Sequence, residues 1–181
     1  MSSMNIYLTN TTRLLRVAVL MTGILLPLNS TSSISKRSLS FFHTHTHETL
    51  EVTYSVGGEY VESALEEIND FLADFRTGDE IIIDPRLLDL IYDVRASLNS
   101  NGTYEVISAY RSPKTNEKLR SKSSGVAKKS QHLLGKAIDV RLRNVDSRDL
   151  RDAALKIKRG GVGYYAKSDF VHMDTGRVRR W

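Results

Sequence analysis

The sequence of 181 residues contains no cysteine. This absence excludes disulfide bonds, thiolate metal sites, cysteine nucleophiles and lipid attachment through an N-terminal cysteine. Any metal ion that the protein binds must therefore be held by histidine, aspartate or glutamate. The length suits one compact domain plus a short segment, and a composition of 40% apolar and 26% charged residues is typical of a folded globular chain.

The chain also lacks an apolar run long enough to cross a membrane comfortably, which takes about 20 residues. A mostly apolar run occupies only residues 17–28; it follows Arg13 and Arg16, and a Ser/Thr-rich stretch comes after it. This order is typical of an export signal. We therefore expect residues 1–33 to direct the protein to the periplasm and to be removed, which would leave no stable membrane insertion. An uncleaved anchor is the alternative.

Acidic residues are absent from residues 1–33, so that removing Arg13 and Arg16 lowers the formal net charge only from +5 to +3. A basic cluster at residues 114–129 contains no aromatic side chain. Proteins that bind nucleic acid usually combine a basic stripe with aromatic residues on which bases stack. The sequence therefore does not favour a nucleic-acid partner.

Residues 34–48 are rich in serine and threonine and carry alternating histidines at positions 43, 45 and 47. A polar segment next to an export signal is usually a linker, although alternating histidines also suit weak binding of a transition metal. We expect a linker here, followed by one folded domain over residues 49–181.

The spacing of apolar residues in 49–181 predicts both strands and amphipathic helices. Asp84 and Pro85 suit the cap and first turn of a helix. Strands are expected at residues 50–54, 104–109, 137–142, 162–165 and 170–175, and helices at residues 61–75, 85–98, 116–120 and 147–158. This order predicts an α+β fold, with an antiparallel sheet that carries the functional site and helices packed on its other face.

Three side chains form a candidate metal site. His132 precedes strand 137–142, Asp139 lies on that strand, and His172 lies on the last strand. Because side chains alternate along a strand, Asp139 points away from the apolar face, and His172 shares its face with Asp174. Two histidines and a carboxylate leave a fourth position for water, as in hydrolytic zinc sites. Taken singly, each residue also suits a turn cap, an ion pair or a buried core position.

Residues 130–139, Ser-Gln-His-Leu-Leu-Gly-Lys-Ala-Ile-Asp, resemble the Ser-x-His-x-x-Gly-x-Ala-x-Asp signature of the D-alanyl-D-alanine-type zinc peptidases. Residues 108–112, 160–165 and 170–176 are similar to segments of the MepK (YcbK-like) murein endopeptidases within that superfamily, and the similarity covers residues 50–181. The resemblance implies the hedgehog/D-Ala-D-Ala-peptidase type of fold. It also implies a Zn²⁺ ion held by the three candidate ligands.

The same resemblance implies an enzyme that hydrolyses the peptide cross-links between peptidoglycan stem peptides. Arg111 would lie beside the scissile carbonyl, where a guanidinium can stabilise an oxyanion or hold a carboxylate. A salt bridge that secures the turn is its alternative role. Ser130 and Tyr110 are expected to contact the substrate, although Ser130 also suits a loop cap and Tyr110 also suits packing in the core.

The sequence departs from the wider superfamily at the general base. The carboxypeptidases of that superfamily resemble one another in having glutamate three residues before the last histidine ligand. That position holds Asp169. We expect Asp174, on the same strand face as His172, to act as the base, and Asp169 is the substitute. A D-Ala-D-Ala carboxypeptidase is the alternative enzyme, and a non-catalytic wall-binding module is the alternative of another class.

Overall fold

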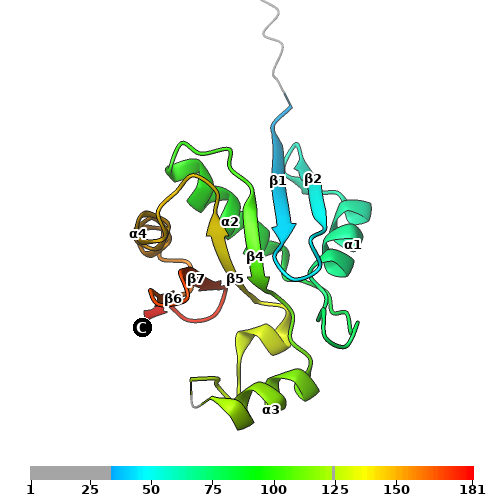
Figure 1. Ribbon diagram of the computed structural model, residues 1–181. Coiled ribbons are helices and arrows are strands. Elements are labelled where there is room, and N and C mark those ends of the chain that lie inside the picture. Colours follow the sequence, from blue (N-terminus) through cyan, green and yellow to red (C-terminus); the bar gives the residue numbers. More distant parts are fainter. Residues whose placement is uncertain (1–33, 124) are drawn as a thin grey trace, which may run out of the picture. The chain divides into compact units, whose positions relative to one another are not determined.

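The computed structural model describes residues 34–123 and 125–181, which contain one mixed sheet of eight strands, in the order β3-β2-β1-β4-β5-β7-β6-β8 (Figure 1). The strands are β1 (Lys36–His43), β2 (Thr49–Val56), β3 (Glu59–Tyr60), β4 (Tyr104–Ser108), β5 (Ala137–Leu142), β6 (Gly161–Tyr165), β7 (Phe170–Asp174) and β8 (Arg179–Arg180). The helices are α1 (Glu62–Phe71), α2 (Pro85–Ser97), α3 (Pro113–Lys122), α4 (Ser147–Ile157) and the 3₁₀ turn η1 (Gln131–Leu134). The predicted α+β class is confirmed.

The expected export signal, residues 1–33, lies outside the described residues. Within the part of the chain that the structure describes, no helix combines the length and apolar character that a membrane span requires.

Strand β1 lies inside the segment that we expected to be a linker, so the prediction of a linker over residues 34–48 is wrong. β1 pairs antiparallel with β2 and parallel with β4, and its side chains Leu39 and Phe41 are buried in the core. These two residues alternate with serine, which is the pattern of a half-buried strand. The Ser/Thr-rich composition obscured that short signal.

The alternating histidines of this segment stabilise the turn after β1. His43 is buried, and its Nδ1 atom accepts hydrogen bonds from the backbone N–H groups of His45 and Thr46, at 3.2 and 3.3 Å. The ring of His45 stacks on Phe75 with 4.2 Å between ring centroids. His43 and His45 therefore act in local packing.

The predicted antiparallel arrangement holds for the strands around the candidate site, since β4, β5, β7 and β6 are joined by antiparallel pairing. The pairs β1–β4 and β6–β8 are parallel, which makes the whole sheet mixed. The predicted strands and helices after residue 49 are confirmed with ends shifted by up to four residues; α3 is twice as long as expected, and β5 has the predicted bounds.

One face of the sheet carries the hydrophobic core. Ile138 and Val140 of β5 and Met173 of β7 are fully buried in the same cluster as the apolar residues of α1, α2 and α4. Because side chains alternate along a strand, this packing turns Asp139 and His172 to the opposite face. The core thus fixes the side of the sheet on which the candidate site lies.

Hydrogen bonds explain where helix α2 begins and where helix α1 ends. Helix α2 begins as predicted, with the Asp84 side chain accepting a hydrogen bond from Arg86 N. Helix α1 ends at Phe71, four residues earlier than expected, because the chain turns and Leu72 O accepts a hydrogen bond from Tyr110 N. This turn joins α1 to the loop after β4.

Candidate metal centre

His132 is held by the short turn η1 between α3 and β5. The Ser130 hydroxyl caps the turn by accepting a hydrogen bond from His132 N at 3.3 Å. Gly135 ends the turn with a φ of +64°, and a Cβ atom there would lie 2.6 Å from the backbone oxygen of Ile82. The serine and glycine of the 130–139 segment therefore have structural reasons to be present.

The register of the sheet brings the other two candidate ligands together. Asp139 on β5 lies directly opposite His172 on β7, and Gly163 on β6 is the neighbour of His172 on its other side. A Cβ atom on Gly163 would lie 2.6 Å from the Trp181 ring, which packs 5.1 Å from the His172 ring between centroids. Glycine at position 163 therefore allows Trp181 to cover one side of His172.

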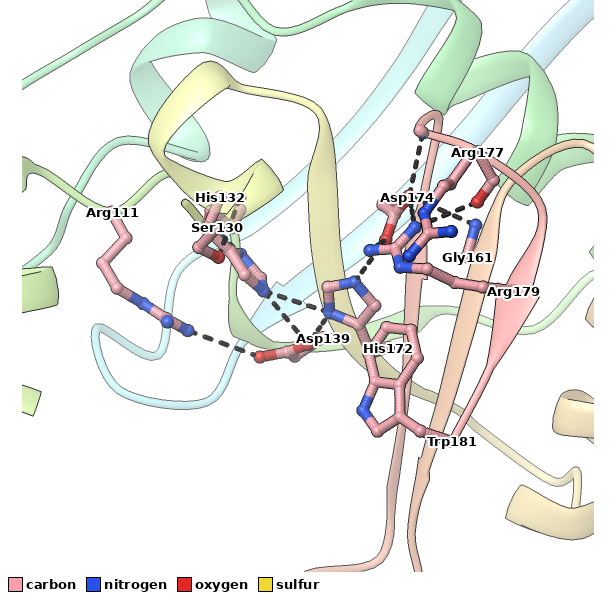
Figure 2. Close-up of polar contacts among 12 residues, drawn as sticks. Arg111, Ser130, His132, Asp139, Gly161, His172, Asp174, Arg177, Arg179 and Trp181 are labelled. Atoms are coloured by element: carbon pink, nitrogen blue, oxygen red, sulfur yellow. Dashed lines mark hydrogen bonds and ion pairs between the residues drawn. The ribbon is translucent and has the colours of Figure 1, made fainter. Parts of the chain in front are cut away.

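His132, Asp139 and His172 converge as predicted from the sequence, and all three are buried (Figure 2). Asp139 Oδ1 lies 2.8 Å from His172 Nδ1 and 3.3 Å from His132 Nε2, and the two ring nitrogens are 3.2 Å apart. Their potential ligand atoms all lie within 4.8 Å of one another. This spacing and donor set fit a single divalent cation such as zinc.

Hydrogen bonds behind the two rings support this fit. His132 Nδ1 donates to the backbone oxygen of Ala109 at 2.6 Å, and His172 Nε2 donates to Asp174 Oδ2 at 2.8 Å. Protons on these outer nitrogens leave His132 Nε2 and His172 Nδ1 with lone pairs that face Asp139. Two lone pairs and a carboxylate that face one another repel unless a positive charge lies between them, so the donor set favours a metal.

The electrostatic environment favours the protonation state of a metal ligand at two of the three residues, His132 and Asp139. Burial lowers the pKa of His132, which keeps its ring neutral. Burial alone would raise the pKa of Asp139, but the two histidines hold the pKa of this carboxyl well below its usual range. Burial opposes a charge on His172, although hydrogen bonds to Asp139 and Asp174 raise its pKa. A neutral His132 and an ionised Asp139 are ready to bind a cation.

A cavity of about 400 Å³ opens onto the three candidate ligands. Its walls carry the cations Arg111, Lys129 and Arg179, and Ser130 also lines it. Tyr165, Phe170 and Trp181 form an aromatic wall, in which the Tyr165 and Phe170 rings stack at 4.5 Å. Among the described residues that line the cavity, Asp139 is the only carboxylate.

Arg111 points across the cavity toward Asp139 (Figure 2). Its Nη2 atom lies 3.7 Å from Asp139 Oδ2 and 3.5 Å from Ser108 Oγ, and its buried Nε atom has no hydrogen-bond partner among the described residues. Burial lowers the pKa of this guanidinium, because it loses water without gaining a close partner. Arg111 therefore lines the cavity with only long contacts from Nη2, and its guanidinium can donate to an oxygen atom there.

Asp174 lies behind His172, on the side away from the other two candidate ligands (Figure 2). It is fully buried, and Arg179 donates to both of its oxygens, at 3.0 and 2.7 Å. The N–H groups of Gly161 and Gly176 also donate to Oδ1. This position does not favour the expected approach of Asp174 to a water molecule in the site, because its oxygens are occupied and it does not line the cavity. The role of Asp174 as the base stays a prediction.

Asp169 and Tyr110 also lie outside the cavity. Asp169 accepts a hydrogen bond from Ser147 Oγ at 2.6 Å and pairs with Arg141 at 3.6 Å, which ties the start of β7 to β5 and α4. Tyr110 is buried in the hydrophobic core, which is the alternative that the sequence left open for it, and it does not line the cavity. Ser130, in contrast, both caps η1 and reaches the cavity.

One buried carboxylate near the site was missed in the sequence. Asp74, in the loop after α1, accepts hydrogen bonds from Ser112 N and Ser112 Oγ, at 2.9 and 2.8 Å. Ser112 follows Arg111 and caps helix α3. Asp74 therefore fixes the segment that presents Arg111. The two residues are far apart in the sequence, and only their closeness in the folded structure reveals this role.

Comparison with known proteins identifies the family. A model described as peptidoglycan L,D-endopeptidase MepK matches residues 31–181. The peptidoglycan L,D-endopeptidase MepK of Escherichia coli strain K12 is 40% identical over 145 residues, which cover 80% of each chain. The probable peptidoglycan L,D-endopeptidase MepK of Haemophilus influenzae is 38% identical over 151 residues, or 83% of this chain and 81% of the relative. No solved structure matches significantly.

The chain belongs to the MepK family of peptidoglycan L,D-endopeptidases. The resemblance seen in residues 130–139 and around His172 is thereby confirmed. The family match begins before residue 34, and so it includes strand β1, in agreement with the place of β1 inside the sheet.

Proposed function

We propose that this protein is a zinc-dependent endopeptidase that hydrolyses peptide cross-links in bacterial peptidoglycan. The observation that carries the proposal is the buried cluster of His132, Asp139 and His172 at the base of a cavity, in a chain of the MepK family. The cavity walls are cationic and aromatic, which suits a peptide that bears free carboxylates.

The three buried side chains would hold the metal through His132 Nε2, Asp139 Oδ1 and His172 Nδ1. Zinc bound there supplies Lewis-acid polarisation of a carbonyl group and activation of water. The hydrogen bonds from His132 to Ala109 O and from His172 to Asp174 orient both rings and fix their tautomers, which keeps the ligand nitrogens directed at one point.

Arg111 is the residue that we assign to the reacting carbonyl. Its backbone is held by the hydrogen bond from Arg111 N to His132 O at 3.2 Å, and its guanidinium lines the cavity, with Nη2 3.7 Å from Asp139 Oδ2. A fixed donor of this kind stabilises the negative charge that develops on the carbonyl oxygen during hydrolysis. Ser130, at the rim of the same cavity, is placed to hydrogen-bond the peptide backbone.

The role that we assign to Asp174 differs from the general base expected from the sequence. Five hydrogen bonds from four residues hold its oxygens, and its contact with the reacting side of the site passes through the His172 ring. We therefore assign it the role of a positioning residue for the metal ligand His172. Asp169 is assigned to the anchoring of β7, because its partners are Ser147 and Arg141.

The location that fits this activity is the cell envelope, where peptidoglycan lies. We propose that residues 1–33 act as an export signal and that the folded domain works in the periplasm. Arg13 and Arg16 before the apolar run support this proposal. The expected partner is the stem peptide of peptidoglycan, with no role for nucleic acid.

The test is digestion of purified peptidoglycan by the full-length protein, with and without a chelator and with zinc restored, followed by mass spectrometry of the products. We expect loss of cross-linked dimers into monomers, with sensitivity to the chelator and no activity in the His132→Ala variant. Intact dimers with shortened stems would indicate a carboxypeptidase instead. Unchanged products despite bound zinc would support a wall-binding module.

A further inference from the structure

Helix α3 and the loop that follows it form a strongly basic part of the surface. We name residues 113–123 and 125–130 the α3 lobe. It contains one acidic residue, Glu117. Its cations are all exposed: Lys114, Lys118, Arg120, Lys122, Lys128 and Lys129.

The cations of the α3 lobe differ from the arginines elsewhere in the described residues. Many of those arginines pair with carboxylates, as Arg143 does with Glu105 at 2.9 Å and Arg159 with Asp93. In the described part of the chain, by contrast, no cation of the α3 lobe lies within 4.0 Å of a carboxylate oxygen. A solvated face that serves only solubility usually mixes both signs, whereas like charges held together repel one another.

The α3 lobe also forms one wall of the cavity that opens onto the candidate ligands. Gly125, Val126, Ala127 and Lys129 line this wall, and the Asn116 side chain donates a hydrogen bond to Ala127 O at 3.3 Å. Figure 1 shows α3 at the end of the sheet, apart from α1, α2 and α4. The unpaired charges therefore lie beside the cavity, on a part of the fold that does not cover the core.

We infer that the α3 lobe is a docking surface for the anionic peptidoglycan polymer, which it attracts through the free carboxylates of neighbouring stem peptides. The inference rests on the proposed function, which it deepens. A cluster of cations beside a cavity raises the local concentration of a polyanion and steers it toward the opening. A polymer with many carboxylates gains from several such contacts at once, whereas a small soluble fragment gains little.

The test separates binding from cleavage by using the full-length His132→Ala protein. Co-sedimentation with purified peptidoglycan sacculi is measured at increasing NaCl concentration. In this background, one variant carries Lys114→Glu, Lys118→Glu and Lys128→Glu, none of which lines the cavity. A matched control carries Lys36→Glu, Arg148→Glu and Lys156→Glu, which change the net charge equally at exposed positions away from the lobe.

We expect the lobe variant to bind sacculi about tenfold more weakly at low salt, and to lose most of the salt dependence that the parent shows. The control should bind within about twofold of the parent, since its charges are remote from the cavity. With His132 restored, the lobe variant should hydrolyse a soluble dimeric muropeptide and bind zinc like the wild type.

Equal losses in both variants would overturn the inference, because net charge alone would then explain the binding. Parent-like binding by the lobe variant, or no binding of sacculi by the parent at low salt, would overturn it as well. Because these measurements use a protein with an inactivated site, their failure is distinct from a failure of the proposed hydrolysis.

Discussion

His172 lies between two buried carboxylates that look alike in sequence but have different surroundings. Asp139 and Asp174 each lie 2.8 Å from one of its ring nitrogens, and the pKa of each is held below its usual range. Asp139 faces the cavity, where Arg111 approaches its second oxygen only to 3.7 Å. Asp174 is enclosed by Arg179 and by two backbone amides. The donors around a carboxylate, more than its burial, decide whether it can hold a metal.

The largest effect is expected when the carboxylate on the cavity side loses its charge. Asp139→Asn removes the anionic ligand while preserving the shape of the side chain. Zinc affinity and hydrolysis should each fall more than about 100-fold, beyond the usual cost of losing an outer partner of a ligand. Metal content measured by mass spectrometry after dialysis, together with digestion of peptidoglycan, tests this. Full zinc occupancy in the variant would remove Asp139 from the ligand set.

A smaller effect is expected from the matched change behind His172. Asp174→Asn keeps an acceptor for His172 Nε2 but removes the charge that fixes the ring, so zinc affinity should fall about 10- to 100-fold. At saturating zinc, kcat should stay within about threefold of the wild type, because a positioning residue acts through the ligand. Zinc titration with a competing chelator and kinetics on a dimeric muropeptide measure both quantities.

The same variant also separates the two roles that Asp174 could have. A general base contributes about 100- to 10,000-fold to the rate, so a loss of that size at saturating zinc would restore the role expected from the sequence. Unchanged zinc affinity together with unchanged kcat would leave Asp174 with only a structural role in holding Arg179.

The smallest effect on hydrolysis is expected when Asp74, a third buried carboxylate, loses its charge. Burial opposes the charge of Asp74, but hydrogen bonding from the Thr115 side chain and then from Ser112 outweighs it and lowers the pKa of this carboxyl in the folded protein. The stability that it contributes is therefore present above the unfolded pKa of about 3.9 and is lost as the pH falls through the folded pKa. Asp74→Asn should lower the free energy of unfolding by about 2 kcal/mol at pH 7.

That difference between Asp74→Asn and the wild type should shrink as the pH falls below about 4. Urea denaturation at a series of pH values measures it. A constant difference from pH 7 to pH 3 would mean that the charge of Asp74 does not stabilise the loop that carries Arg111.

Much of the candidate site could be predicted from the sequence, because it depends on local rules. The period of two along a strand was enough to direct Asp139 and His172 away from the apolar face, and the cap at Asp84 marked the start of α2. The same rules missed β1, because only Leu39 and Phe41 carry its alternation within a Ser/Thr-rich segment. Pairing with β2 and β4, which lie later in the chain, is what makes this segment a strand.

The sequence by itself determined the α+β class, the three candidate ligands and the family, because alternation and motif spacing are local properties of the chain. Only the tertiary structure decided the surroundings of the remaining acidic residues. Asp174 and His172 share a strand face in any register, but β6 and β8 supply the Gly161 amide and Arg179 that enclose Asp174. Contacts between segments distant in sequence set the environment of a charged group, and that environment sets its chemistry.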